Sequence, residues 1–283
     1  MQDLAYYDGK ITSIDEMMIP LRDRAHFFGD GVYEVAMARN YIIYALDEHI
    51  DRFYQSAAAL EINIPYKKNE LTEFLCSLVK KLDFHEQRVY WQVTRGYGVE
   101  AREHTYCDST QGKLWVMLCP SKVKDIYMPV KAITLSDTRW QHCNIKSINL
   151  IPVVTYAQKA KRRGAYEAIL YREGGRVTEC SHSNVHIITS NGIFKTAPAD
   201  NLILAGIARS KLISACHSLG INVEENPFRI DEMMNADEII LSSTSGMCMI
   251  CESIDGISVG GKNKAAVDAL RNWVMEDFIE KTR

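Results

Sequence analysis

The sequence predicts an α+β protein with two domains. Hairpin signals outnumber strand–helix–strand units, which disfavours a doubly wound sheet. A short, polar, Pro-led segment at 120–125 is the best linker candidate, and 283 residues suffice for two hydrophobic cores. We therefore expect a small N-terminal α+β domain at 1–119, a linker at 120–125, and a larger C-terminal α+β domain at 126–283.

The N-terminal domain is expected to combine β-hairpins with two helices. Asp8-Gly9 and Arg39-Asn40 separate short β-prone segments and predict tight turns. Apolar residues then recur at helical spacing, with Asp47 as the expected N-cap. The predicted helices are 47–60 and 69–81, and the predicted strands are 4–7, 11–14, 32–38, 41–45, 89–94 and 114–119.

The C-terminal domain again mixes strands and helices. Asn191-Gly192 and the Gly174-Gly175 pair predict turns, and Pro152 suits the first turn of a helix that ends at Gly164. The predicted strands are 130–135, 165–171, 176–179, 185–189, 193–196 and 238–241, and the predicted helices are 152–164, 206–219 and 264–281.

Composition excludes several classes of protein. The net charge of −3 argues against a nucleic-acid partner. No apolar run approaches the roughly 18 residues of a membrane span, and the first ten residues lack the pattern of a signal peptide. We therefore expect no membrane partner, a cytoplasmic location, and reduced cysteines in the core.

Familiar metal, redox and nucleotide motifs are absent or incomplete. Cys248-x-x-Cys251 has no second ligand pair for zinc and lies in an extended segment, which disfavours both a metal and a redox role. His182 and His186 also lie in an extended segment, where a spacing of four does not form a metal pair, so no metal is expected. The sequence has no G-x-G-x-x-G, no phosphate-binding P-loop and no G-x-S-x-G.

Several segments resemble those of the fold-type IV (class IV) pyridoxal-phosphate-dependent aminotransferases. This family includes D-amino-acid and branched-chain aminotransferases and aminodeoxychorismate lyase. The similarity runs from about Asp8 to Ile254, and the D-amino-acid aminotransferases match most closely. The matching segments are Phe28-Gly29-Asp30-Gly31-Val32-Tyr33-Glu34, His49-Ile50-Asp51-Arg52, Asn144-Ile145-Lys146-Ser147, Val177-Thr178-Glu179, Ser183-Asn184, Ile203-Leu204-Ala205-Gly206-Ile207-Ala208-Arg209 and Ser243-Thr244.

The resemblance implies pyridoxal 5'-phosphate in a cleft between the two domains, held by Lys146 as a Schiff base. A Schiff base needs a deprotonated amine, and burial or neighbouring positive charge favours that form of a lysine. The resemblance makes Lys146 the acid–base group that moves a proton between the substrate Cα and the cofactor C4′. It places Glu179 against the pyridine nitrogen, where a carboxylate keeps the ring protonated.

The cofactor phosphate needs a cation and free backbone N–H groups. By resemblance the cation is Arg52, which lies in the N-terminal half of its predicted helix. The amides would come from Ile207 and Ala208 at a helix start, although a threonine is common at position 208 in the family. Thr244, Ser183 and Asn184 are further expected cofactor contacts, and Arg139 is expected to lie behind the site and to order the lysine.

The substrate carboxylate needs a planar donor such as a guanidinium. Arg102-Glu103-His104 resembles the R-x-H carboxylate trap of D-amino-acid aminotransferases, assisted by Tyr33. The preceding residues 97–101 are more numerous than is usual there, and His182 interrupts a serine-rich stretch. Other cations that could meet the carboxylate instead are Arg22, Arg24 and Arg95.

The resemblance implies ping-pong transamination between a D-amino acid, such as D-alanine or D-glutamate, and a 2-oxo acid, 2-oxoglutarate or pyruvate. It also implies a homodimer. The alternatives are a branched-chain L-amino-acid or amine transaminase, an aminodeoxychorismate lyase, and a relative that binds a ligand without turnover.

Overall fold

The computed structural model describes residues 2–97 and 102–283. The chain forms two compact units. Unit 1 comprises Met1–Lys122, Ile145–Asn149 and Ile279–Arg283, and unit 2 comprises Val123–Asn144 and Leu150–Phe278. The sequence-based ranges differ from these bounds at 145–149 and 279–283, which were assigned to the C-terminal domain.

Unit 1 is built on a six-stranded antiparallel sheet with the order β2-β1-β6-β5-β3-β4. Asp8 and Gly9 both have positive φ and form the predicted turn between the first two strands. Asn40, also at positive φ, lies in the connection of the second hairpin. The strands are β1 (Leu4–Tyr7), β2 (Lys10–Thr12), β3 (Gly31–Arg39), β4 (Ile42–Ile43), β5 (Glu86–Thr94) and β6 (Lys113–Pro120).

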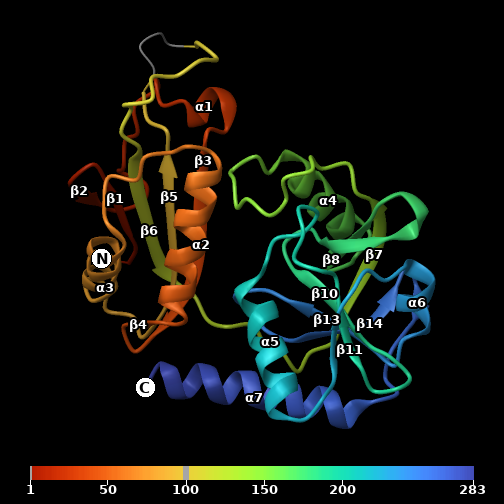
Figure 1. Cartoon of the computed structure of the whole chain (residues 1–283). Helices are drawn as coiled ribbons and strands as arrows, with labels where there is room; N and C mark the ends of the chain where they lie inside the picture. The colour runs from red at the N-terminus through yellow and green to blue at the C-terminus, as the bar shows by residue number, and fades with distance from the viewer. Residues whose placement is uncertain (1, 98–101) are drawn as a thin grey trace. The chain divides into compact units, whose positions relative to one another are not determined.

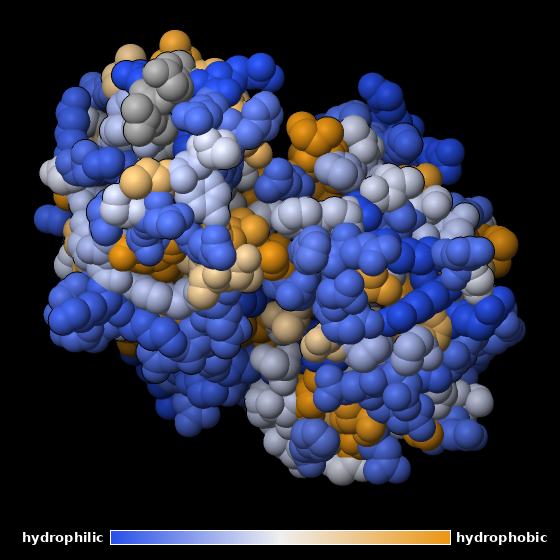
Figure 2. Space-filling model, turned by 45° about the horizontal axis from the view of Figure 1, so that its top comes forward, coloured by the Kyte–Doolittle hydropathy of each residue, from blue (hydrophilic) through white to orange (hydrophobic). Residues whose placement is uncertain are grey.

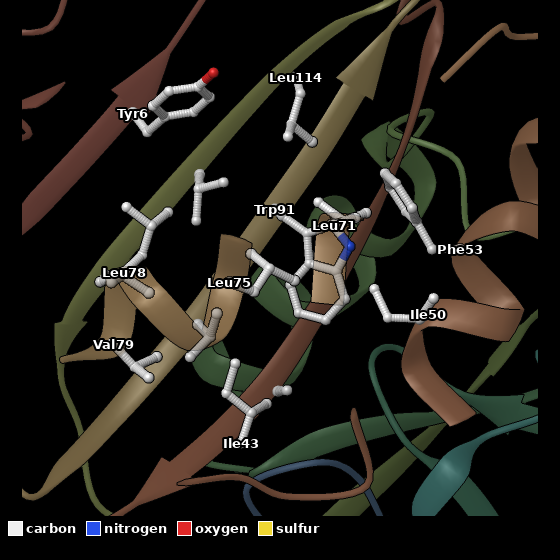
Figure 3. Close-up of a cluster of buried hydrophobic side chains, with 14 of the residues drawn as sticks. Tyr6, Ile43, Ile50, Phe53, Leu71, Leu75, Leu78, Val79, Trp91 and Leu114 are labelled. Carbon is white, nitrogen blue, oxygen red and sulfur yellow. The ribbon is translucent and has the colours of Figure 1, made fainter. Parts of the chain in front are cut away.

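Two helices, α2 (Leu46–Ala59) and α3 (Lys68–Val79), bury their apolar faces against this sheet, while α1 (Ala25–Phe28) is a single turn (Figure 1). Trp91 of β5 lies among Ile50 and Phe53 of α2 and Leu71 and Leu75 of α3 (Figure 3). The expected N-cap at Asp47 is wrong. The helix begins one residue earlier, and Asp47 lies in its first turn, where a carboxylate suits the helix dipole.

The segment Ile145–Asn149 returns to unit 1 and runs along the start of β3. Tyr33 N donates to Lys146 O at 3.0 Å, and Ile148 N donates to Gly31 O at 3.1 Å. An antiparallel bridge joins Val32 to Ser147 between these bonds. The close approach requires Gly31, because a Cβ there would lie 3.1 Å from the Ile148 side chain and 2.8 Å from Val93 O.

Unit 2 is built on a mixed sheet with the order β12-β11-β10-β13-β14-β7-β8-β9, with β15 paired to β14. β7 lies parallel to both β14 and β8, and β11 lies parallel to β12. The strands are β7 (Val130–Ser136), β8 (Glu167–Tyr171), β9 (Val177–Cys180), β10 (Asn184–Ile188), β11 (Phe194–Thr196), β12 (Val223–Glu225), β13 (Glu238–Ser242), β14 (Met249–Ile254) and β15 (Ile257–Ser258). With helices on both units, the α+β class is confirmed.

The helices of unit 2 are α4 (Ile151–Arg162), α5 (Ile207–Ser218), α6 (Ile230–Asn235) and α7 (Lys264–Lys281), with a 3₁₀ turn, η1 (Glu173–Gly175). Cys248 and Cys251 are buried free thiols. Cys251 lies in β14, but Cys248 lies in the turn before it, so the expected extended conformation is wrong for Cys248. Within residues 2–97 and 102–283, no helix combines the length and apolarity that a bilayer crossing needs. Hydrophilic residues dominate the face shown in Figure 2, and hydrophobic residues are exposed there in small groups.

Candidate active site

In unit 1, the Lys146 amine lies over the ring of Tyr33. Its Nζ is 4.5 Å from the ring centroid, and the backbone of Lys146 is fixed by Ser56 Oγ, which accepts from Lys146 N at 3.1 Å. No hydrogen bond or ion pair engages Nζ within the described part of the chain. The main chain is therefore held while the amine remains free to react.

Arg52 lies beside a buried carboxylate. Glu34, which is 0% exposed, accepts hydrogen bonds from Arg52 Nε at 2.7 Å and Arg52 Nη2 at 2.9 Å. His49 Nδ1 lies 2.7 Å from Glu34 Oε2. Burial alone would raise the pKa of Glu34, but Arg52 and His49 outweigh it and lower the pKa to about 2.

The same cluster fixes the state of His49. Burial lowers the pKa of His49, although Glu34 opposes that effect. The imidazole is therefore neutral, and Nδ1 must carry its hydrogen because a carboxylate only accepts. Glu34 thus orients both a neutral ring and the guanidinium of Arg52.

Sequence reasoning gave no role to Glu34 or His49, although both stand in the segments that carry the family resemblance. The sequence signal for the burial of Glu34 is its position in β3. Glu34 lies two residues from both Val32 and Ala36, which face the core, and side chains two apart in a strand point to the same face, so the carboxylate is placed inside. A buried carboxylate requires a cationic partner.

The R-x-H residues lie on an exposed segment of unit 1. Arg102 and His104 are exposed, and the Arg102 guanidinium has no partner among the described residues. Arg24 and Arg95, two of the alternative cations, are instead bound to Asp30 and to main-chain carbonyls. Apart from Tyr97, the longer loop 97–101 lies outside the described residues.

In unit 2, Glu179 is the centre of a polar cluster at the end of β9. Arg139 Nη1 donates to Glu179 Oε1, while Asn184 Nδ2 at 3.1 Å and Leu204 N at 3.0 Å donate to Oε2. Arg139 is itself fixed by Asp137, through Nε at 2.9 Å and Nη2 at 2.8 Å. Within unit 2, Arg139 therefore positions Glu179.

Burial makes the Glu179 carboxyl a weaker acid than an exposed glutamate. Desolvation raises the pKa of the carboxyl, although Arg139 and the Leu204 amide oppose that effect. A buried carboxyl with a raised pKa has a high affinity for a proton and is a strong acceptor for a ring N–H. This property suits a partner of a protonated nitrogen heterocycle.

The start of α5 is joined to this cluster. Asn184 Nδ2 donates to Leu204 O at 2.9 Å, and Asn184 Oδ1 lies so close to Gly206 that a Cβ there would be 2.1 Å away. No side chain caps α5, and its first main-chain bond runs from Ser210 N to Gly206 O. The amides of Ile207 and Ala208 precede that bond and point out of the helix start, as an anion site requires.

Two expected cofactor residues have partners within the protein. Ser183 Oγ donates to the buried carboxylate of Glu167 at 2.6 Å, and Thr244 also has a partner. His182, which departs from the family's serine-rich stretch, places Nδ1 3.0 Å from Glu167. Glu167 was not anticipated; it ties the 181–183 turn to β8 and so helps to orient Asn184.

The two histidines that the sequence analysis considered as a metal pair, His182 and His186, lie in different environments. His186 is fully buried, with Thr196 Oγ1 at 2.9 Å and Ser242 Oγ at 2.8 Å from its two ring nitrogens, whereas the side chain of His182 is half-exposed. Across the described ranges, no group of three or more His, Cys, Asp or Glu side chains could hold a metal ion.

The fold and these residues define an aminotransferase of class IV. The family model described as amino-transferase class IV matches residues 31–254, and the chain belongs to that family. The family uses pyridoxal phosphate. Each unit by itself offers groups of the kind that this cofactor needs: unit 1 has the amine of Lys146 and the cation at Arg52, and unit 2 has the open amides of α5 and the proton affinity of Glu179.

Two curated D-alanine aminotransferases are similar to this chain along nearly its whole length. The chain is 37% identical to a D-alanine aminotransferase of Bacillus licheniformis, covering 96% of this chain and 97% of the relative. It is 39% identical to a D-alanine aminotransferase of Listeria monocytogenes, covering 93% and 92%.

Solved structures show the same fold at lower identity. A branched-chain aminotransferase of Thermoproteus uzoniensis superposes with a TM-score of 0.86 at 22% identity, covering 98% of this chain and 95% of that chain. The branched-chain amino acid aminotransferase of Escherichia coli gives 0.88 at 18% identity, covering 100% and 97%.

Proposed function

We propose that the protein transfers amino groups between a D-amino acid, such as D-alanine or D-glutamate, and a 2-oxo acid, 2-oxoglutarate or pyruvate. The reaction is ping-pong: one amino acid leaves as its oxo acid before the second oxo acid is aminated. The observation that carries the proposal is the similarity to D-alanine aminotransferases along nearly the whole chain. The branched-chain neighbours, at 18–22% identity, support the fold alone.

Lys146 is the proposed catalytic residue. When bound, pyridoxal phosphate supplies an aldehyde carbon for the amino group and a ring that withdraws the electrons of the broken Cα–H bond. Lys146 Nζ would hold the cofactor through its aldehyde carbon in the resting enzyme and would be released when the substrate amino group takes its place. The released Nζ would then take the proton from the substrate Cα and deliver it to C4′. The fixed main chain and free amine of Lys146 support this role.

Glu179 is the proposed partner of the pyridine nitrogen. A protonated ring nitrogen withdraws electrons more strongly than a neutral one, so a carboxylate that retains a proton at this atom promotes the loss of the Cα proton. Arg139 and Asn184 keep the two oxygens of Glu179 in place. Their proposed function is to prevent the carboxylate from rotating away from the ring.

Arg52 and the start of α5 are the proposed phosphate site. Arg52 offers positive charge in an orientation set by Glu34, and Ile207 N and Ala208 N offer hydrogen-bond donors at the positive end of a helix. Thr244, Ser183 and Asn184 remain proposed contacts. The side chain of Ala208 offers no hydroxyl, so this position contributes only its amide.

Arg102, His104 and Tyr33 are the proposed substrate site. A guanidinium binds a carboxylate with two parallel hydrogen bonds, which fixes the orientation of the amino acid as well as its position. Because Lys146 acts from one side, only one enantiomer presents its Cα hydrogen to Nζ while its carboxylate occupies the trap. Among the described residues Arg102 has no protein partner, which supports this assignment.

We further propose that the protein is a cytoplasmic homodimer. The support is the family resemblance for the dimer, and the eight free cysteines for a reducing compartment. Light scattering of the purified protein tests the dimer, and a mass near 32.2 kDa for the particle would contradict it.

The reaction is tested by titrating the yellow holoenzyme with D-alanine and with L-alanine under an absorption spectrometer. D-alanine is expected to bleach the visible band and release pyruvate, and L-alanine is expected to leave it unchanged. The variant K146A is expected to lose the band of the covalently held cofactor.

Three outcomes contradict the proposal. Bleaching by L-leucine alone would assign a branched-chain substrate. Continued turnover, with more than one equivalent of product released per subunit in the absence of any added oxo acid, would assign a lyase. An unchanged chromophore and unchanged turnover in K146A would remove the catalytic role of Lys146.

A further inference from the structure

The segment Arg102–Tyr106 has no strand or helix of its own. It lies in the connection between β5 and β6, and its described residues form only turns, bends and extended chain. Such a segment has no ladder of main-chain hydrogen bonds to fix it. Other residues of unit 1 must therefore hold its backbone if its side chains are to act at a defined position.

One guanidinium, that of Arg24, supplies these bonds. Nη1 donates to Glu103 O at 2.6 Å and to Thr105 O at 3.1 Å, and Nη2 donates to His104 O at 3.1 Å. Arg24 is only 5% exposed. Three consecutive carbonyls, two in the R-x-H segment and one directly after it, thus converge on one buried side chain.

Asp30 fixes the guanidinium from the other side. Arg24 Nε donates to Asp30 Oδ2 at 2.8 Å, and Arg95 Nε donates to the same carboxylate at 2.9 Å. Arg95 is held in turn by Leu60 O at 2.6 Å and Glu61 O at 2.8 Å. Arg24 is therefore anchored through Asp30 and Arg95 to the end of α2.

The end of the segment is attached to the same network. The ring of Tyr106 lies 3.6 Å from the Arg95 guanidinium carbon, and its hydroxyl donates to Glu61 Oε2 at 2.6 Å. The ring of His104 lies 5.2 Å from that of Phe28, which Arg24 also contacts. These contacts come from residues that precede β3, follow α2 or follow β5, so the support is tertiary.

The Asp23-Arg24 pair also holds the chain before the loop. Arg24 N donates to Gly96 O at 3.0 Å, and Asp23 forms a bridge with Tyr97. Arg24 therefore binds the chain both at Gly96 and at 103–105, and Asp23 adds a contact at Tyr97.

We propose that Arg24 is a positioning residue for the substrate carboxylate, because it fixes the backbone that carries Arg102 and His104. This inference rests on the proposed function of Arg102 and His104 as the carboxylate trap. Only a forked, planar donor satisfies three carbonyls and a carboxylate at once, and a lysine ammonium, with three donors at one point, cannot.

The test follows the first half-reaction by stopped flow. Holoenzyme is mixed with increasing D-alanine, and the loss of the visible band gives an apparent Kd and a limiting rate. In R24K we expect the apparent Kd to rise about tenfold while the limiting rate changes less than about threefold, because at least two hydrogen bonds to a charged donor are lost. The control R39K, which alters an arginine bonded to Thr282 O at the far end of β3, is expected to stay within about twofold of wild type on the same scale.

A double-substitution cycle separates positioning from general damage. R24K is expected to have less than about a twofold effect on the apparent Kd in an R102K background, since its action passes through Arg102. An effect of equal size in both backgrounds would overturn the proposal. So would a fall in thermal stability and cofactor content with no change in the apparent Kd.

Y106F provides a second variant that preserves the ring and removes one hydrogen bond at an accessible position. It is expected to raise the apparent Kd about two- to fivefold. If R24K does not yield soluble holoenzyme, an unchanged apparent Kd in Y106F would contradict the proposal.

The variant R102K separates the proposed carboxylate trap from the proposed positioning role of Arg24. An unchanged apparent Kd in R102K refutes the trap itself, whereas a raised value in R102K with an unchanged value in R24K refutes only the positioning role.

Discussion

Substitution of Glu34 by glutamine should cost this protein a large part of its stability while leaving its shape nearly unchanged. The two carboxylate oxygens accept from Arg52 Nε, Arg52 Nη2 and His49 Nδ1. Glutamine keeps one acceptor and introduces an NH2 group that faces donors. At least one bond is then lost, and the guanidinium is left without a compensating charge.

Two estimates of the magnitude agree. The pKa of Glu34 falls from its ordinary 4.5 to about 2, and at about 1.4 kcal/mol per pKa unit the charged form contributes about 3 kcal/mol to folding. Removing one partner of a buried ion pair generally costs about 3–5 kcal/mol. We therefore expect E34Q to lower the free energy of unfolding by about 3 kcal/mol at pH 7.

The assay is urea unfolding of the cofactor-free protein, followed by tryptophan fluorescence. Trp91 is a suitable reporter because its ring lies 6.2 Å from that of His49 in the same core. D51N is the control, since the ion pair of Asp51 with Lys68 is more than half exposed, and such pairs contribute about 1 kcal/mol or less. A cost below about 1 kcal/mol for E34Q, or equal costs for the two variants, would refute the role of the buried cluster.

Acid supplies a second test of the same group. A lowered pKa means that the contribution of Glu34 is fully present above about pH 4.5 and is lost as the pH falls through about 2. The stability difference between wild type and E34Q should therefore be constant from pH 8 to pH 5 and should shrink at lower pH. A difference that grows on acidification would show that the sign of the argument is wrong.

Three further predictions concern other parts of the chain. E179Q should retain the bound chromophore but lower the limiting rate of the half-reaction about 100-fold or more, since an amide does not hold a proton on the ring; an unchanged rate excludes the assigned role. G112A should destabilise unit 1 by about 2 kcal/mol or more because the new Cβ would lie 2.7 Å from Asn63 O, whereas G9A, with open space but positive φ, should cost about 1 kcal/mol in the same urea assay. Burial lowers the pKa of His186 to about 3, so the unfolded chain takes up a proton first and stability falls as the pH drops below 6.5; a variant H186Q should show a flatter profile between pH 6.5 and 4.

Local sequence patterns predicted most of the secondary structure. The Asp8-Gly9 turn, the helix α3 and the final helix α7 follow from turn chemistry and apolar periodicity over a few residues. The start of α2 was missed by one residue because the chain enters it through Ala45 at positive φ, a conformation that composition does not reveal.

Resemblance to the family selected the individual residues of the candidate site. The sequence did not predict which neighbours those residues contact. Motif matches selected Lys146, Arg52 and Glu179, because the order of several weak motifs is specific where each alone is not. They assigned no partners to these residues. The parity of Glu34 in β3 was a usable signal for burial, but the identity of its partners was not.

By itself, the sequence determined the α+β class, most of the strands and helices, and the family to which the chain belongs, since these depend on patterns along the chain. Only the tertiary structure decided that Ile145–Asn149 leaves unit 2 to pair with β3, and that Arg24 and Asp30 support a segment about 75 residues away in sequence. The physical reason is that buried charges and main-chain carbonyls must find partners wherever the fold brings them, and sequence distance carries no information about which partners those are.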